Sequence, residues 1–163
     1  MEKLWAPWRG EYISKITKKS STCVFCDILK EKKDQENFIV HRSKYTFSVL
    51  NIYPYNNGHM LVMPNRHVDD LSKLKCDERE DLFDLLESTK VLLDHAMKPD
   101  GYNIGINLGK AAGAGFPDHM HIHLVPRWRG DVNFMPVMGD TKVISQSLES
   151  LHEKLLEAHE KYH

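Results

Sequence analysis

Polar and apolar positions alternate most clearly between residues 118 and 126. His119, His121 and His123 take every second position there, and apolar residues lie between them. A period of two is that of a β-strand, in which successive side chains point to opposite faces. We therefore expect a strand that presents a row of imidazoles on one face and buries its other face in a core. Three histidines are an unusual choice for a merely solvated face, so the row favours a functional site.

Shorter apolar runs predict further strands earlier in the chain. Two of them flank a tight turn, and a third is a purely apolar run that ends at Pro64. Turn-forming residues at 51–58 predict a loop, and glycine and alanine dominate a second loop at 109–115. The expected strands span residues 38–40, 45–50, 60–63 and 103–108.

Apolar residues recur at helical spacing in two segments. The first helix is expected to begin near Asp77, which with Glu80 resembles a capping box, and to end near Pro99. The second is an amphipathic C-terminal helix over about 141–163. A short helix is also expected after Cys23.

Most of the strands lie too close in sequence to be joined by crossover helices. The expected fold class is therefore α+β, an antiparallel sheet flanked by helices. A chain of 163 residues predicts a single domain over 1–163, with residues 1–22 as an irregular N-terminal segment. No apolar stretch approaches the roughly 20 residues that a membrane-spanning helix needs. The N-terminus has no apolar run of signal-peptide length, so we expect a cytoplasmic protein.

Charge and cysteine content exclude several classes of function. The formal net charge of −1 gives no overall attraction to nucleic acid or to an anionic membrane, so neither is an expected partner. An anionic substrate must therefore be met by local groups. Three cysteines in a domain of this size do not indicate a disulfide framework.

Cys23 and Cys26 form a C-x-x-C pair, which alone is typical of a redox motif, a metal site or two core thiols. A redox motif is expected after a strand in a βαβ unit, and the sequence predicts none. Zinc needs two more ligands to complete a tetrahedron, and His67 and His119 are available. We predict a structural zinc site of these four residues, because four protein ligands leave no open position.

With His119 assigned to the metal, His121 and His123 remain for chemistry. A histidine nitrogen can attack phosphorus and carry a nucleotidyl group, which divides one difficult displacement into two easier ones. His121 is central in the row and is the predicted nucleophile. His123 is expected to hydrogen-bond a phosphate oxygen or the leaving group.

Two neighbouring features point to phosphate binding. The loop at 109–115 lets backbone amides approach phosphate oxygens, and Lys110 adds a positive charge, although a flexible glycine loop is the alternative interpretation. His59, at the opening of another strand, either contacts phosphate or satisfies a loop carbonyl.

The segment His119-x-His121-x-His123-Leu124-Val125 resembles the signature of the histidine triad, or HIT, family. Gly58-His59-x-Leu61-Val62-x-Pro64 and the following His67 resemble its second conserved block, and Cys23-x-Phe25-Cys26 resembles its zinc-binding branch. Three further blocks are similar to bacterial diadenosine tetraphosphate phosphorylase-like members of the family. They are Trp5-Ala6-Pro7-Trp8-Arg9, residues 50–59 and residues 126–134.

The resemblance implies a HIT fold, usually assembled as a homodimer or a larger homo-oligomer. It also implies cleavage of a dinucleoside polyphosphate, with diadenosine tetraphosphate as the expected substrate, through a nucleotidyl intermediate on His121. It places the nucleoside near Asn51. The implied phosphate contacts are Asn107, the loop from Gly113 to Gly115, and His123.

The chain departs from the HIT pattern at Gly115 and Phe116, where many HIT hydrolases carry Gln followed by Ser or Thr. Whether phosphate or water is the acceptor, and whether magnesium accompanies the substrate, stays open at this level. One alternative function is hydrolysis of nucleoside phosphoramidates or adenylylated conjugates. Another is a non-catalytic nucleotide-binding regulatory module, although pure binding needs no free central histidine.

Overall fold

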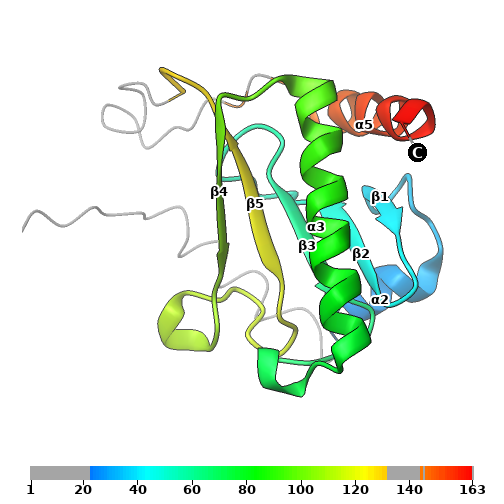
Figure 1. The fold of residues 1–163 in the computed structure, drawn as a ribbon, viewed down its shortest axis with the longest axis vertical. Coiled ribbons are helices and arrows are strands. Elements are labelled where there is room, and N and C mark those ends of the chain that lie inside the picture. Colours follow the sequence, from blue (N-terminus) through cyan, green and yellow to red (C-terminus); the bar gives the residue numbers. More distant parts are fainter. Residues whose placement is uncertain (1–22, 132–143, 145, 163) are drawn as a thin grey trace, which may run out of the picture.

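A computed structural model describes residues 23–131, 144 and 146–162, and within these ranges it contains one antiparallel sheet with helices on both faces (Figure 1). The strand order is β1-β2-β3-β5-β4. This architecture confirms the predicted α+β class. The strands are β1 (Ile39–Arg42), β2 (Thr46–Leu50), β3 (Met60–Pro64), β4 (Gly101–Ile106) and β5 (Ile122–Arg127).

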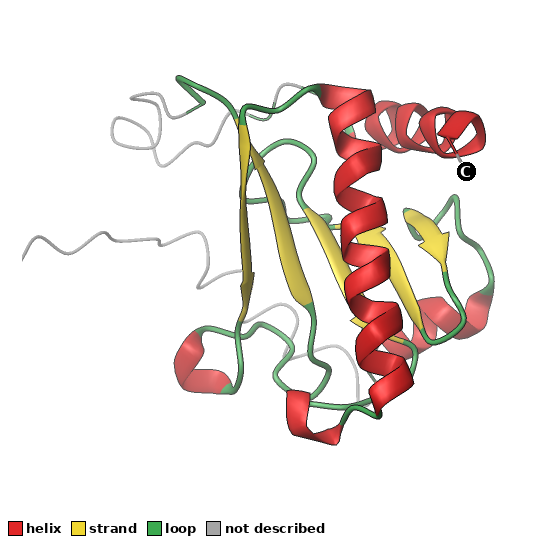
Figure 2. Ribbon diagram, in the orientation of Figure 1, coloured by secondary structure: helices red, strands yellow, loops and turns green. Residues whose placement is uncertain are grey.

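Three α-helices pack on this sheet within the described residues (Figure 2). The long helix α3 (Cys76–Met97) crosses one face, and the C-terminal helix α5 (Leu148–Tyr162) lies beside it. The short helix α2 (Val24–Glu31) follows Cys23, as predicted. Two 3-10 turns, η1 (Leu71–Lys73) and η2 (Lys110–Ala112), lie in the loops after β3 and β4.

The period of two along the strands divides the core between the two faces. Val62 and Ile122 belong to the larger cluster, which includes the buried leucines of α3 and α5. Leu61 belongs to the smaller cluster, which includes Phe25 of α2. Because His123 pairs with Leu61 and alternates with Ile122, its side chain lies on the α2 face of the sheet.

The histidine row therefore faces away from α3, and its apolar neighbours are buried as predicted. These neighbours are Met120, Ile122 and Leu124, all in the larger cluster. The strand itself begins only at Ile122, so His119 and His121 lie in the segment that leads into it. Sheet pairing stops there because the backbone N–H of Met120 donates to the carbonyl of Val68 (2.7 Å) rather than to β3.

The prediction of a capping box at Asp77 and Glu80 is wrong. Helix α3 begins at Cys76, and the backbone N–H of the preceding Lys75 donates to the carboxylate of Glu78 (2.8 Å). Arg66, in the loop after β3, donates two hydrogen bonds to the same carboxylate. A residue distant in sequence therefore helps to determine where the helix begins.

The C-terminal helix is shorter than predicted. It begins at Leu148 instead of about 141, and residues 144, 146 and 147 are not helical. Ser147 precedes the first turn, where its hydroxyl accepts a hydrogen bond from the backbone N–H of Ser150 (3.2 Å). A serine in this place satisfies an otherwise unpaired amide and favours a helix start.

Some predictions fall outside the described residues. These are the irregular segment 1–22, which includes the Trp5–Arg9 block, and the end of the block at 126–134. Among the helices that the structure describes, none combines the length and the apolar character needed to cross a membrane.

Candidate functional site

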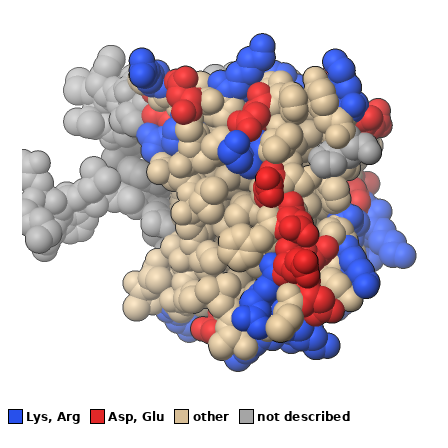
Figure 3. Space-filling view, in the orientation of Figure 1, with Lys and Arg blue, Asp and Glu red and all other residues tan. Residues whose placement is uncertain are grey.

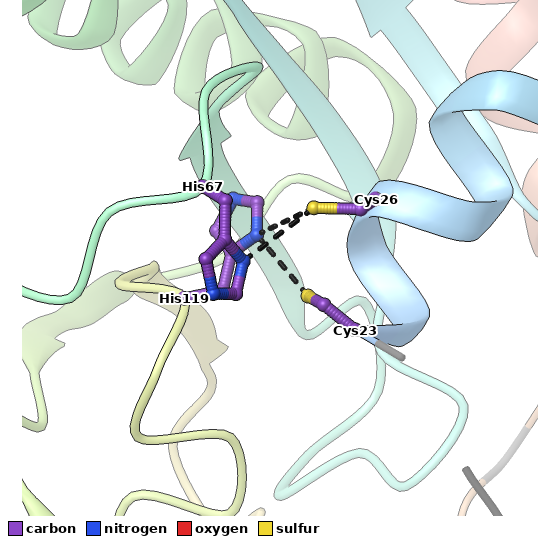
Figure 4. A group of neighbouring side chains, drawn as sticks. All are labelled: Cys23, Cys26, His67 and His119. Atoms are coloured by element: carbon purple, nitrogen blue, oxygen red, sulfur yellow. Dashed lines mark hydrogen bonds between the residues drawn. The ribbon is translucent and has the colours of Figure 1, made fainter. Parts of the chain in front are cut away.

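Four side chains from three distant segments converge beside the sheet, on the α2 side (Figure 4). Cys23 and Cys26 come from the start of α2, His67 from the loop after β3, and His119 from the segment before β5. Their potential ligand atoms all lie within 4.8 Å of one another. The structure thus brings together the four residues predicted to bind metal.

The distances within this group fit a zinc ion. Nδ1 of His119 lies 3.3 Å from Sγ of Cys23 and 3.7 Å from Sγ of Cys26, and Nδ1 of His67 lies 3.5 Å from Sγ of Cys26. A tetrahedron with ordinary Zn–S and Zn–N bond lengths requires a sulfur-to-nitrogen separation of about 3.5 Å.

The orientation of His119 also suits a ligand. Its Nε2–H donates to the carbonyl of Pro64 (2.9 Å), which leaves Nδ1 unprotonated and facing the sulfurs. Burial lowers the pKa of His119 to about 4, so the ring is neutral near neutral pH. A neutral imidazole is the form that binds a metal.

The C-x-x-C pair lacks the low thiol pKa that is typical of a redox motif. Burial and the neighbouring Cys23 together raise the pKa of the Cys26 thiol to about 11. Reactive cysteines in redox pairs have lowered pKa values instead. The raised thiol pKa therefore argues against disulfide exchange, and the set of two thiols and two imidazoles favours metal binding.

His121 is held in the protonation state that a nucleophile needs. Its Nδ1–H donates to the backbone carbonyl of His119 (2.9 Å), so in the neutral ring Nε2 carries the free lone pair. The residue is only 5% exposed, and this burial lowers its pKa. An unprotonated nitrogen is thus available near neutral pH.

Phe25 is a site residue that sequence analysis did not identify. Its ring centroid lies 5.3 Å from that of His121 and 5.5 Å from that of His119. The C-x-x-C helix therefore packs directly against both the predicted nucleophile and a predicted metal ligand. The position of Phe25 between the two cysteines was the available signal.

His59 lies behind His123 and is fully buried (0% exposed). Its Nε2 is 3.0 Å from Nδ1 of His123, while its Nδ1 receives the backbone N–H of Tyr55 (3.0 Å). Both ring nitrogens of His59 are therefore engaged within the protein. These two contacts differ from a bond to a loop carbonyl, and the phosphate contact of His59 stays a prediction.

The other predicted substrate contacts lie around this pair of histidines. The Asn51 amide is 3.3 Å from Nδ1 of His59, and the Asn107 amide is 3.4 Å from Nε2 of His123. Gly113 ends η2 with a φ of +80°, and Gly115 lies in the bend before Phe116. In this chain Phe116 packs against Phe25, with ring centroids 5.0 Å apart.

A pocket of about 440 Å³ opens between the loops after β3 and β4. Neither His121 nor His123 lines it, and its lining residue Asp118 directly precedes His119. Its charged lining consists of Lys110 and the carboxylates of Asp69, Asp70 and Asp118.

The fold and the histidine row define a class of protein, and comparisons with known proteins agree. Residues 32–130 match the family described as "HIT domain", and the chain belongs to this family. It is 36% identical over 162 residues to a protein of Mycobacterium tuberculosis named AP-4-A phosphorylase, a match that covers 95% of this chain and 83% of the relative.

A second enzyme and a solved structure extend the comparison. A bis(5'-adenosyl)-triphosphatase of Saccharomyces cerevisiae is 35% identical over 92 residues, which are 56% of this chain and 44% of that protein. The crystal structure of a Zn-bound histidine triad family protein from Mycobacterium smegmatis superposes with a TM-score of 0.69 at 26% identity. That match covers 86% of this chain and 94% of the other.

Proposed function

We propose that this protein is a nucleotidyl-transfer enzyme that cleaves dinucleoside polyphosphates, with diadenosine tetraphosphate as the substrate. The observation that carries the proposal is the orientation of His121, whose Nδ1–H is tied to a backbone carbonyl and whose Nε2 is left with a free lone pair. Two relatives named for reactions of diadenosine polyphosphates support the choice of substrate.

The reaction proceeds in two displacements at phosphorus. In the first, the Nε2 lone pair of His121 forms a bond to the α-phosphorus, and the bond from that phosphorus to the bridging oxygen breaks. The released polyphosphate keeps the electron pair and departs as an anion. In the second, an oxygen of the acceptor attacks the same phosphorus, the N–P bond breaks, and His121 is restored.

The carbonyl of His119 supports both steps. When Nε2 bonds to phosphorus, the ring gains positive charge, and the Nδ1–H donated to the carbonyl becomes a stronger hydrogen bond. The same contact holds the ring plane, so Nε2 returns to the same position after each turnover. The remaining proposed contacts are with the substrate. Asn51 contacts the nucleoside, and Asn107 and residues 113–115 contact the phosphates.

We place phosphate first as the acceptor, because the relative matched over 95% of this chain is named a phosphorylase. Magnesium bound to the polyphosphate belongs to the proposal as well. The neighbouring pocket carries the carboxylates of Asp69, Asp70 and Asp118, and an anion approaches them more readily when a cation offsets its charge.

We further propose that Cys23, Cys26, His67 and His119 hold zinc. With four protein ligands the ion has a structural role: it joins α2 to the loop after β3 and to the segment before β5. Thiolate ligands need a reducing compartment, which supports the cytoplasmic location expected from the sequence.

Product analysis tests the reaction. Diadenosine tetraphosphate labelled at the α-phosphorus should transfer label to the protein in an acid-labile form, and His121→Ala should abolish both the labelling and the turnover. His95→Ala is the matched control, because His95 is exposed on the opposite face of the sheet. ADP formed only with phosphate present means phosphorolysis, whereas AMP formed in either case means hydrolysis. Full turnover by His121→Ala would end the proposal.

A homodimer through β4 is the proposed assembly. Among the described residues this strand is at the edge of the sheet and pairs only with β5, so its other side offers backbone groups to a second copy. Ile104 of β4 and Phe83 of α3 are 54% and 59% exposed and line one shallow pocket. In Figure 3, surface with few charges lies over the strands beside the acidic stripe of α3.

Light scattering after gel filtration tests the assembly. Wild type should elute as a dimer, and Ile104→Lys should elute as a monomer because it places a charge in the proposed interface. Ile52→Lys is the control, since Ile52 is equally apolar and 53% exposed but lies in the loop after β2. A monomeric wild type, or a dimeric Ile104→Lys, would exclude this interface.

A further inference from the structure

A chain of three hydrogen bonds sets which nitrogen of His123 carries its proton. The chain begins at a backbone amide, whose role as a donor is fixed by covalent structure. The N–H of Tyr55 donates to Nδ1 of His59 (3.0 Å), and Nε2 of His59 lies 3.0 Å from Nδ1 of His123. Nε2 of His123 then lies 3.4 Å from Nδ2 of Asn107.

A second donor also points at Nδ1 of His59. The Oδ1 atom of Asn51 accepts the backbone N–H of Tyr53 (2.9 Å), which orients the amide so that its NH₂ group faces Nδ1 of His59 (3.3 Å). Two donors therefore point at one nitrogen of His59, and that nitrogen must be the acceptor. The proton of the neutral ring is on Nε2.

The position of the proton on His59 also determines the tautomer of His123. Since Nε2–H of His59 donates, Nδ1 of His123 must accept, and its proton is on Nε2. Moving a proton to either Nδ1 would set two N–H groups against each other at 3.0 Å. In the structure the Asn107 amide presents Nδ2, a donor, to Nε2 of His123, so donation from Nε2 requires the amide to be rotated until Oδ1 takes that place.

Neighbouring histidines are thus held in opposite tautomers. His121 donates at Nδ1 to a carbonyl and keeps Nε2 bare, whereas His123 accepts at Nδ1 and keeps Nε2 protonated. The two rings are 4.8 Å apart between centroids. A nucleophile and a hydrogen-bond donor therefore sit side by side.

The loop that supplies the Tyr55 amide is anchored at its far side. Nδ2 of Asn56 donates to the carbonyl of Pro126 (3.1 Å) and to the carboxylate of Asp131 (2.8 Å). Arg127 forms two hydrogen bonds with the same carboxylate, at 2.7 and 2.8 Å. The ring of Tyr55 itself stacks on that of His123 at 5.5 Å. The donor at the head of the chain is therefore held in place from both sides.

We propose that His59 is a positioning residue that relays the Tyr55 amide to His123 and fixes His123 as a neutral Nε2–H donor, so that the site favours leaving groups that depart as anions. This inference rests on the proposed function for the identity of the reacting phosphorus. A phosphate-chain end departs with its electron pair and needs only a hydrogen bond, whereas an amine must gain a proton. A neutral imidazole stabilises the first but is a poor acid for the second.

The substitution His59→Gln tests whether the two hydrogen bonds of His59 are sufficient without its imidazole ring. A glutamine amide offers an oxygen that accepts from Tyr55 and an NH₂ group that donates to His123, with a spacing close to that of the two ring nitrogens. His59→Leu fills the same buried space but breaks the relay. We expect kcat with diadenosine tetraphosphate to fall about tenfold or more in His59→Leu with little change in KM, and His59→Gln to recover most of that loss.

The tautomer is measured directly by ¹⁵N NMR of His123 in the substrate-free protein. Wild type and His59→Gln should show the proton on Nε2 from pH 6 to 8, and His59→Leu should show a mixture. In parallel, the ratio of rates for diadenosine tetraphosphate and adenosine phosphoramidate should favour the polyphosphate in wild type and fall in His59→Leu.

The outcomes distinguish this inference from the proposed function. A proton on Nδ1 of His123, or a doubly protonated ring in this pH range, would overturn the relay even if His121 forms the nucleotidyl intermediate. So would equal kcat values for the two variants. The wild-type spectrum decides the tautomer even if His59→Leu does not fold. Absence of any nucleotidyl-protein would instead overturn the proposed reaction and leave the tautomer assignment standing.

Discussion

Glu78 provides a sharp test of how the loop that carries His67 is held. Its carboxylate accepts three hydrogen bonds: from Nε and Nη2 of Arg66, at 2.8 and 2.7 Å, and from the backbone N–H of Lys75, at 2.8 Å. The Glu78 side chain is only 7% exposed. Replacing it by glutamine keeps the shape, removes the charge and turns an NH₂ group toward these donors.

The expected loss of stability follows from the titration of this carboxyl. Hydrogen bonding from Arg66 lowers the pKa of Glu78 from 4.5 to about 2. A shift of this size corresponds to about 3 kcal/mol. The Arg66 side chain is 44% exposed, so solvent screens the pair, and we expect about 2 kcal/mol for Glu78→Gln at pH 7. In a domain of this size that is roughly 4–8 °C in Tm.

The sign of the pH dependence is fixed by the direction of this shift. A carboxyl whose pKa is lowered by folding stabilises the folded state fully above the unfolded value of 4.5, and the contribution disappears as pH falls toward about 2. The difference between wild type and Glu78→Gln should therefore be constant from pH 8 to 6 and shrink below pH 4.5.

Urea unfolding of both proteins at several pH values measures this difference. Glu80→Gln is the matched control, because Glu80 is exposed on the same helix, and we expect a change within about 0.5 kcal/mol. A difference below about 0.5 kcal/mol for Glu78→Gln at pH 7, or one that stays constant down to pH 3, would refute the reasoning.

Two further predictions concern the metal site and the loop before β3. Cys26→Ser should abolish stoichiometric zinc, measured by elemental analysis, and should lower Tm by roughly 10 °C through loss of about 3 kcal/mol of metal binding. The exposed Cys76→Ser should change neither quantity, and equal zinc in both variants would contradict the ligand assignment. Gly58→Ala should destabilise the fold by about 2 kcal/mol in urea melts, because the residue has a φ of +73° and a methyl group there would lie 2.6 Å from Sδ of Met97. Gly101→Ala meets open space and should be nearly neutral, so similar losses for the two glycine variants would count against this explanation.

Local patterns in the sequence were sufficient for much of the architecture. Alternation with a period of two predicted which side of the histidine segment is buried, and Met120, Ile122 and Leu124 are all in the core. The helix ends were predicted less well, because α3 starts where Arg66 and Glu78 meet and no local rule contains that contact.

Residue chemistry was likewise sufficient to nominate the metal ligands. Zinc prefers thiolate and imidazole, and the chain has few cysteines to choose from, so Cys23 and Cys26 with His67 and His119 formed a short list. The structure brings these four side chains together, and it adds Phe25, whose contacts with two histidines depend on how α2 packs on the sheet.

The sequence by itself determined which residue types carry the chemistry and which face of a strand they share, since both properties depend on side chains a few positions apart. Only the tertiary structure decided how the histidines are protonated. His59 meets His123 across 64 positions of sequence, and the tautomers are set by a backbone amide at Tyr55 and a backbone carbonyl at His119. Every residue except proline has such an amide and every residue has such a carbonyl, so their identity carries no signal in the sequence. What gives them a role is the path of the folded chain, which brings one donor and one acceptor within 3.0 Å of the imidazoles.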